Sequence, residues 1–125
     1  MLIRPDRPAR EILTIERCYV RELLNDERVP QTSLAECRVE PGVTTQLHRL
    51  SVAEWYLIRE GDGLMEVAGS EYFPVVPGDV VAIPPNTAQR ISNTGASDLT
   101  FLCLCVPAFT PGCYEALEPD DGAAR

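Results

Sequence analysis

Short apolar runs separated by turn-forming residues constrain the fold of this chain more than any other feature. Eleven prolines and eight glycines are distributed among 125 residues. Because proline and glycine interrupt regular structure, this spacing is typical of an all-β domain with many tight turns. A chain of this length corresponds to one domain. We therefore predict a sandwich or small barrel.

The pattern predicts about eight strands. A less regular stretch, residues 12–25, has weak helical spacing of Tyr19, Leu23 and Leu24, but we favour an extended segment at a sheet edge. Gly61-Asp62-Gly63 is interpreted as a hairpin turn, because it lies between two strands and opens no helix. The clearest expected strands are residues 34–39, 54–59, 64–68, 72–76, 80–83, 89–92 and 99–106.

Charge and hydropathy exclude several classes of partner. The net charge of −8 repels phosphate backbones and anionic lipids, so we expect neither a nucleic-acid nor a membrane partner. No apolar run reaches the ~20 residues that cross a bilayer, and the charged N-terminal stretch is unlike a secretory signal. We therefore expect a cytoplasmic protein. Its five cysteines, an odd number, are interpreted as free and mostly buried thiols.

The chain contains a single histidine, His48, which limits the chemistry available to it. Zinc sites built from several histidines are excluded within one chain. Cys103 and Cys105 share one face of an expected strand, because side chains alternate along a strand. That pair could hold a soft metal or simply pack, and the sequence leaves open whether their face points inward.

Two blocks of residues with fixed spacing include this histidine. The first is Gly42-VTTQL-His48-Arg49-Leu50-SVA-Glu54-WYLIRE-Gly61, and the second is Gly78-DVVAI-Pro84-Pro85-Asn86-TA-Gln89-RIS-Asn93. Their order and spacing resemble the paired motifs of the cupin superfamily without gaps. The resemblance implies a double-stranded β-helix, or jelly-roll, barrel. We therefore predict an N-terminal extension over residues 1–29 (an edge strand or dimer arm), a barrel over 30–110, and a C-terminal segment over 111–125 that frays after Leu117.

The resemblance also implies a metal site, from which this chain departs. The four family ligand positions correspond to His48, Leu50, Glu54 and Gln89. Leu50 has no lone pair to donate, and the amide of Gln89 is a weaker ligand than an imidazole. The remaining three residues suit a divalent ion (Mn, Ni, Zn or Fe) with several water ligands, or no ion at all. No organic cofactor is expected.

Each candidate residue has a structural alternative. His48 is either a ligand or proton shuttle, or a barrel histidine hydrogen-bonded to Glu54 or Gln89. Glu54 is a ligand, or a general base if no metal is present. Alternation points Arg49 and Arg90 away from the interior. It likewise turns Trp55 and Leu57 outward, where they would form an apolar patch suited to a homodimer.

Two functions follow from this pattern. The first is a metal-dependent isomerase, cyclase or related enzyme that acts on a small organic substrate, with Glu54 and His48 as catalytic residues. The alternative is a non-catalytic small-molecule-binding protein, a sensor or accessory subunit without metal. In both cases the pocket is expected inside the barrel, lined by His48, Leu50, Glu54 and Gln89. The apolar walls are expected from Ala35, Cys37, Val39, Tyr56, Ile58, Ile83 and Ile91.

Overall fold

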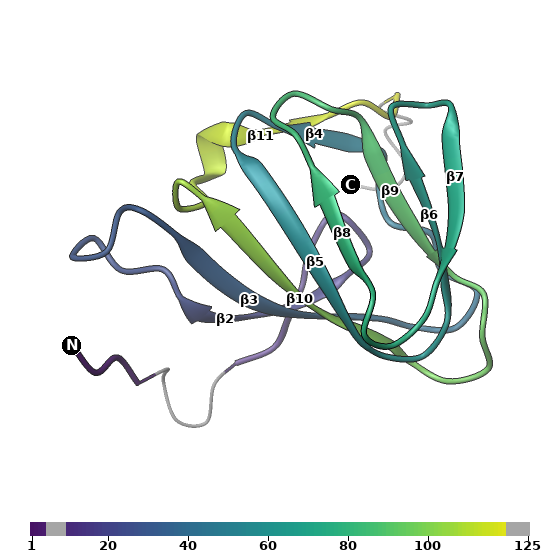
Figure 1. Cartoon of the computed structure of the whole chain (residues 1–125), viewed down its shortest axis with the longest axis horizontal. Coiled ribbons are helices and arrows are strands. Elements are labelled where there is room, and N and C mark those ends of the chain that lie inside the picture. The colour runs from purple at the N-terminus through teal and green to yellow at the C-terminus, as the bar shows by residue number, and fades with distance from the viewer. Residues whose placement is uncertain (5–9, 120–125) are drawn as a thin grey trace.

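Two antiparallel β-sheets enclose a common interior (Figure 1). The computed structural model describes residues 1–4 and 10–119, and over these ranges it contains eleven strands and one short 3-10 helix. The strands are β1 (Ile12–Leu13), β2 (Tyr19–Leu24), β3 (Ser33–Val39), β4 (His48–Leu50), β5 (Ala53–Glu60), β6 (Gly63–Val67), β7 (Glu71–Val75), β8 (Val80–Ile83), β9 (Gln89–Asn93), β10 (Leu99–Val106) and β11 (Tyr114–Ala116). The helix, η1, covers Pro111–Cys113.

The chain winds back and forth between the two sheets. One sheet has the strand order β1-β2-β3-β10-β5-β8, and the other has the order β11-β4-β9-β6-β7. From β3 onward, every connection except β6–β7 crosses from one sheet to the other. This alternation produces a jelly roll. The predicted all-β double-stranded β-helix is therefore confirmed.

The turn at Gly61 corrects one prediction. β5 belongs to the first sheet and pairs with β10 and β8, whereas β6 pairs with β7 and β9 in the second sheet. Gly61-Asp62-Gly63 is therefore a crossover between sheets and not a hairpin. Gly61 has φ +84°, and a Cβ there would lie 2.6 Å from the backbone oxygen of Asp98. The glycine is needed because the chain turns sharply against the start of β10.

Strand alternation gives the barrel its core. All the residues predicted as apolar walls are buried except Ala35, which is half-buried. Only Ala35, Cys37 and Tyr56 line the cavity inside the barrel, whereas the others pack in the hydrophobic core: Val39, Ile58, Ile83 and Ile91. On β10, Leu99, Phe101, Cys103 and Cys105 point inward, which settles the parity that the sequence left open. On the outer face, Leu57 and Leu104 are exposed and Trp55 is half-buried, as the alternation predicts. Homodimer formation through this face stays a prediction.

Both terminal segments contact the barrel. β1 and β2 are extended and lie at the edge of the six-stranded sheet, where β2 pairs with β3. Near the other end, Glu118 bonds to Arg17 and to the backbone of Leu47, and fraying after Leu117 stays a prediction. The rest of the expected frayed end, residues 120–125, lies outside the described residues. Within residues 1–4 and 10–119, no helix is long and apolar enough to cross a membrane.

Candidate functional site

A cavity of about 190 Å³ lies inside the barrel. Its lining is mostly apolar and comes from both sheets and from the segment that precedes β2. Such a lining with a few convergent polar groups is typical of small-molecule sites. The polar groups fall into two sets, one around His48 and the other around Glu54. Of the four residues predicted to line the pocket, His48, Leu50 and Glu54 do so, whereas Gln89 lies behind Glu54 and is not part of the lining.

His48 is held in one orientation by the backbone next to it. Its ring is 2% exposed, and Nδ1 lies 2.7 Å from the carbonyl oxygen of Gln46. Because a carbonyl only accepts hydrogen bonds, Nδ1 must carry a proton. The other nitrogen, Nε2, lies 3.2 Å from Oε1 of Glu16. In a neutral ring, Nε2 is therefore the basic nitrogen, and a carboxyl group faces it.

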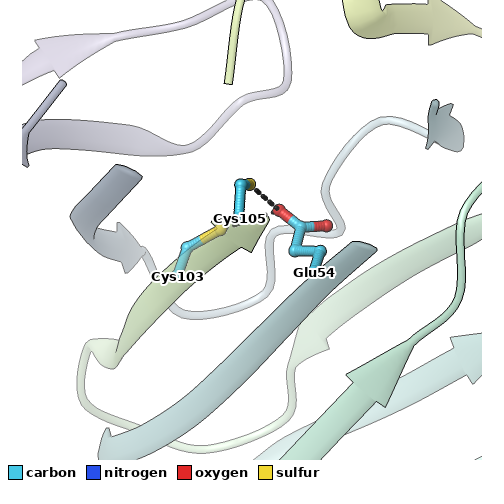
Figure 2. A group of neighbouring side chains, drawn as sticks. All are labelled: Glu54, Cys103 and Cys105. Atoms are coloured by element: carbon cyan, nitrogen blue, oxygen red, sulfur yellow. Dashed lines mark hydrogen bonds between the residues drawn. The ribbon is translucent and has the colours of Figure 1, made fainter. Parts of the chain in front are cut away.

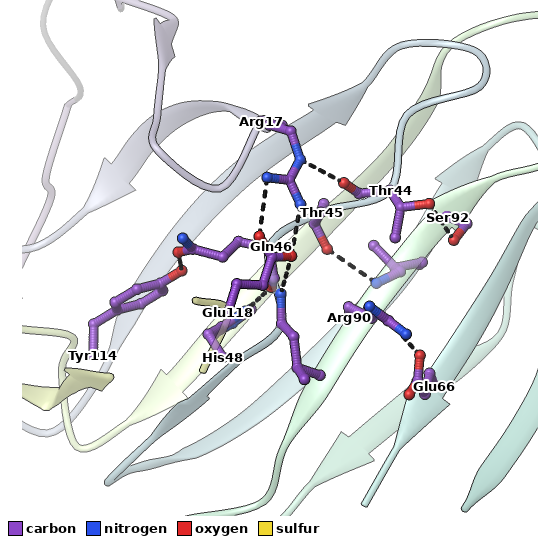
Figure 3. Close-up of polar contacts among 12 residues, drawn as sticks. Arg17, Thr44, Thr45, Gln46, His48, Glu66, Arg90, Ser92, Tyr114 and Glu118 are labelled. Atoms are coloured by element: carbon purple, nitrogen blue, oxygen red, sulfur yellow. Dashed lines mark hydrogen bonds and ion pairs between the residues drawn. The ribbon is translucent and has the colours of Figure 1, made fainter. Parts of the chain in front are cut away.

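An aromatic ring covers one face of this imidazole. Tyr114, at the start of β11, stacks on His48 with ring centroids 4.8 Å apart and an interplanar angle of 16°. The Tyr114 hydroxyl donates to Oε1 of Gln46, which Figure 3 shows beside His48. Burial raises the pKa of Tyr114 well above its ordinary value, with a further contribution from the charge of Glu16. Tyr114 thus stays neutral and restricts the ring of His48.

Glu16 reaches the cavity from a tight turn between β1 and β2. The turn is closed by hydrogen bonds from Thr14 to the Cys18 carbonyl, and the Glu16 carbonyl accepts from the backbone N–H of Gln46 at 3.0 Å. The Glu16 side chain is 23% exposed. Burial raises the pKa of this carboxyl; the neighbouring His48 opposes that shift, and Glu54 adds to it. Glu16 is therefore biased toward carrying a proton.

A clamp formed by Arg17 and Glu118 fixes this turn over the barrel. Arg17 has φ +66°, and its guanidinium donates to the Thr44 carbonyl at 2.9 Å and to both carboxylate oxygens of Glu118 (Figure 3). Glu118 also accepts from the backbone N–H of Leu47 at 3.0 Å. The guanidinium lowers the pKa of Glu118. Segments from both ends of the chain thus meet beside His48.

Glu54 forms the second polar set with the two inward thiols of β10. Its Oε2 lies 2.7 Å from Sγ of Cys103 and 3.8 Å from Sγ of Cys105, and Figure 2 shows the three side chains converging. Its Oε1 accepts from the amide nitrogen of Gln89, whose own oxygen accepts from the Tyr56 hydroxyl at 2.8 Å. Both carboxylate oxygens of Glu54 therefore have assigned partners.

The cavity contains four thiols in two pairs, and all five cysteines of the chain are free. A hydrogen bond with Cys18 and burial raise the pKa of Cys37. A hydrogen bond with Cys105 and burial likewise raise the pKa of Cys103. The thiols of Cys37 and Cys103 are therefore biased toward the protonated form.

The family's metal position does not fit the residues present in this chain. Gln89 is fully buried and turns its NH₂ group toward Glu54, because a carboxylate can only accept; its oxygen already accepts from Tyr56. Leu50 offers no donor atom. Nε2 of His48 faces Glu16. The structure brings Glu54 and Gln89 together, but it gives His48 a different partner.

Sequence reasoning missed Glu16 and Tyr114. Both lie outside the two motif blocks, and no spacing in the chain connects them to His48. The sequence did indicate His48, Glu54 and the shared face of Cys103 and Cys105. Asn86 of the second motif block adopts φ +59°, a left-handed conformation that asparagine tolerates.

Comparison with known proteins agrees with this fold. Residues 35–105 match the family model described as a cupin domain. The chain belongs to the cupin family. This cupin is 38% identical over 109 residues to uncharacterized protein MJ1618 of Methanocaldococcus jannaschii, with 85% of this chain and 86% of that protein covered.

Two solved cupin structures illustrate the range of similarity. One, from Thermotoga maritima, is described as a predicted oxalate decarboxylase; it is 28% identical with a TM-score of 0.66, covering 72% of this chain and 80% of its own. The other is Pac13 of Streptomyces, described as a nucleoside dehydratase. It is 16% identical with a TM-score of 0.78, covering 94% of this chain and 92% of its own. At that identity the likeness to Pac13 concerns the fold alone.

Proposed function

We propose that this cupin is an enzyme that moves a proton on a small organic molecule bound in its cavity, as an isomerase, cyclase or dehydratase does. One observation carries the proposal: Nε2 of His48 faces Oε1 of Glu16 at 3.2 Å on the cavity wall, while Nδ1 is held by the Gln46 carbonyl. An imidazole that is held through one ring nitrogen by a hydrogen bond, and that uses the other nitrogen as the base, is the usual arrangement for general acid–base catalysis by histidine.

The proposed chemistry needs one mobile proton. Nδ1 keeps its proton on the Gln46 carbonyl, so a single further proton is shared between Nε2 of His48 and Oε1 of Glu16. With that proton on Glu16, Nε2 is the base that removes a proton from carbon. With the proton on His48, the ring is the acid that protonates a leaving oxygen or an enolate. Tyr114 stacks on the His48 ring, so it fixes the orientation of the imidazole and shields one face of it from water.

Glu54, the other catalytic residue predicted from the sequence, lines the same cavity. We assign proton transfer to the His48–Glu16 pair because Gln89 and Cys103 already bond the two oxygens of Glu54. Dehydration is included among the candidate reactions because Pac13, which has the same fold, is described as a nucleoside dehydratase. Structures of that protein are described with uridine. Uridine is therefore one member of a probe set.

The test is solvent deuterium incorporation. The protein is incubated in D₂O with a panel of nucleosides including uridine, keto sugars and small keto acids, and carbon-bound deuterium is followed by NMR. We expect incorporation or turnover for at least one class, and loss of it in His48→Gln and Glu16→Gln. Glu22→Gln is the matched control, because Glu22 lines the same cavity from β2, and its side-chain hydrogen bond among the described residues is with Asn25 rather than with His48 or Glu16.

Two outcomes would contradict the proposal. Equal deuterium incorporation in His48→Gln would exclude the pair as the acid–base group. A thermal shift with one of the panel compounds, without any exchange or turnover of it, would favour the alternative of a non-catalytic binding protein.

A further inference from the structure

We propose that Glu54, Cys103 and Cys105 bind a thiophilic divalent cation, Zn²⁺ or a chemically similar ion, on the cavity wall. This site shares Glu54 with the position that the cupin motifs imply, but its other two ligands come from β10 instead of from His48 and Gln89. The three donor atoms, Oε2 and two Sγ, all lie within 4.8 Å of one another (Figure 2). Zinc in proteins binds thiolates at ~2.3 Å and carboxylates at ~2.0–2.2 Å, so donors around one ion are spaced on this scale.

The charge of the site favours a cation. Glu54 is 5% exposed, and a buried carboxylate is costly unless it is paired with a positive charge. The ion pairs formed within residues 1–4 and 10–119 use eight other carboxylates, and none of these pairs includes Glu54. Its partners are two thiols and one amide. A cation would provide the missing charge.

The carboxylate is already oriented for this role. Gln89 bonds Oε1, and Tyr56 fixes Gln89 in turn at 2.8 Å, which leaves Oε2 directed at the thiols. Residues that hold a ligand from behind in this way are typical of metal centres. The two sulfur atoms come from alternate positions of β10, a rigid central strand that pairs with both β3 and β5.

The donor set also identifies the type of ion. Two thiolates and one carboxylate favour zinc over the hard ions Mg²⁺ and Ca²⁺, which prefer oxygen ligands. Three protein ligands leave a fourth position of the tetrahedron for water or a bound molecule, and all three ligands line the cavity. Binding replaces the two S–H protons with two S–metal bonds and releases both protons to solvent, without any redox change.

Cobalt(II) is the spectroscopic probe, because its thiolate complexes absorb in the near ultraviolet. Reduced protein treated with a chelator is titrated with Co²⁺ and then with Zn²⁺. We expect one equivalent of Co²⁺ with a sulfur-to-cobalt band, which one equivalent of Zn²⁺ abolishes. Cys103→Ser, Cys105→Ser and Glu54→Gln should each weaken binding by more than about 100-fold, beyond the loss that an outer-shell change causes.

Cys37→Ser is the matched control, because Cys37 is another buried thiol of the same cavity. It should bind cobalt like the wild type, and so should His48→Gln, which separates this site from the acid–base pair. Circular dichroism checks that each variant is folded. If the serine variants fail to fold, Zn²⁺ protection of Cys103 and Cys105 from alkylation in the wild type, read by mass spectrometry, provides the same test.

The proposal is overturned by any of three results. The wild type shows no thiolate band at saturating Co²⁺; the band persists in a folded Cys103→Ser/Cys105→Ser variant; or the band is lost in Cys37→Ser. In the alkylation experiment, equal labelling of Cys103 and Cys105 with and without Zn²⁺ would overturn it.

Discussion

Oε1 of Glu16 lies 3.2 Å from Nε2 of His48, although Glu16 belongs to a turn that precedes the barrel and His48 begins β4, a strand of the barrel. The N-terminal segment therefore completes the site. The arginine next to Glu16 is bonded to Glu118 near the other end of the chain, so the position of the carboxyl depends on three separate segments. Changes far from the cavity are expected to affect its chemistry through this clamp.

Tyr56→Phe tests the buried network behind Glu54. The substitution keeps the ring, which packs on Phe101 with centroids 4.4 Å apart, but removes the donor to Gln89. An unsatisfied buried oxygen costs about 1–3 kcal/mol, so the free energy of unfolding should fall by that amount in urea denaturation. Tyr72→Phe, whose hydroxyl lies on an exposed residue, should change it by less than about 0.5 kcal/mol. Equal effects of the two substitutions would contradict this account.

Two glycine substitutions separate backbone strain from steric overlap. Gly42 and Gly61 both have positive φ, +78° and +84°, but a Cβ meets nothing within 4 Å at Gly42 and lies 2.6 Å from a backbone oxygen at Gly61. Gly42→Ala should cost about 1–2 kcal/mol, the usual cost of a left-handed alanine. Gly61→Ala should cost more than about 3 kcal/mol, because overlap adds to strain. Thermal unfolding of both variants is the measurement, and similar melting temperatures would exclude a tight contact at Gly61.

Glu118→Gln tests the clamp through pH. Arg17 lowers the pKa of Glu118 below its ordinary value of 4.5, so the unfolded chain binds a proton more readily than the folded one. The stability from this pair is therefore present above about pH 4.5 and is lost as the pH falls through the folded value. At pH 7 the variant should lose about 1 kcal/mol, the upper end for a partly exposed pair. The free energies of unfolding of the wild type and the variant, measured by denaturation at each pH, should become equal in acid. A difference that is constant from pH 7 to pH 3 would contradict this account.

The motif residues were predictable because strand alternation and fixed spacing place them on the inner face. His48, Glu54 and Gln89 start or lie in strands whose inward direction follows from the jelly roll. For Cys103 and Cys105, alternation predicted only that they share a face of β10, and the structure turns that face inward. The hairpin predicted at Gly61 was wrong because local turn chemistry does not say which sheet receives the next strand. Only the pairing of β6 with β7 and β9 decides that.

The partners of His48 could not be predicted for a related reason. Glu16 and Tyr114 lie in segments that precede and follow the barrel, and nothing in their local sequence specifies where those segments dock. Their contacts depend on tertiary interactions such as the Arg17–Glu118 pair and the pairing of β11 with β4. The amide orientation of Gln89 likewise follows from Tyr56 and Glu54, which are distant in sequence.

The acid–base pair can be tested directly by ¹⁵N NMR of the imidazole, because the untagged chain has one histidine and its ring signals need no assignment. At neutral pH, Nδ1 is expected to be protonated, and the Nε2 signal should shift in Glu16→Gln. A neutral ring protonated at Nε2 and bare at Nδ1, or an Nε2 signal that is unchanged by Glu16→Gln, would contradict the account.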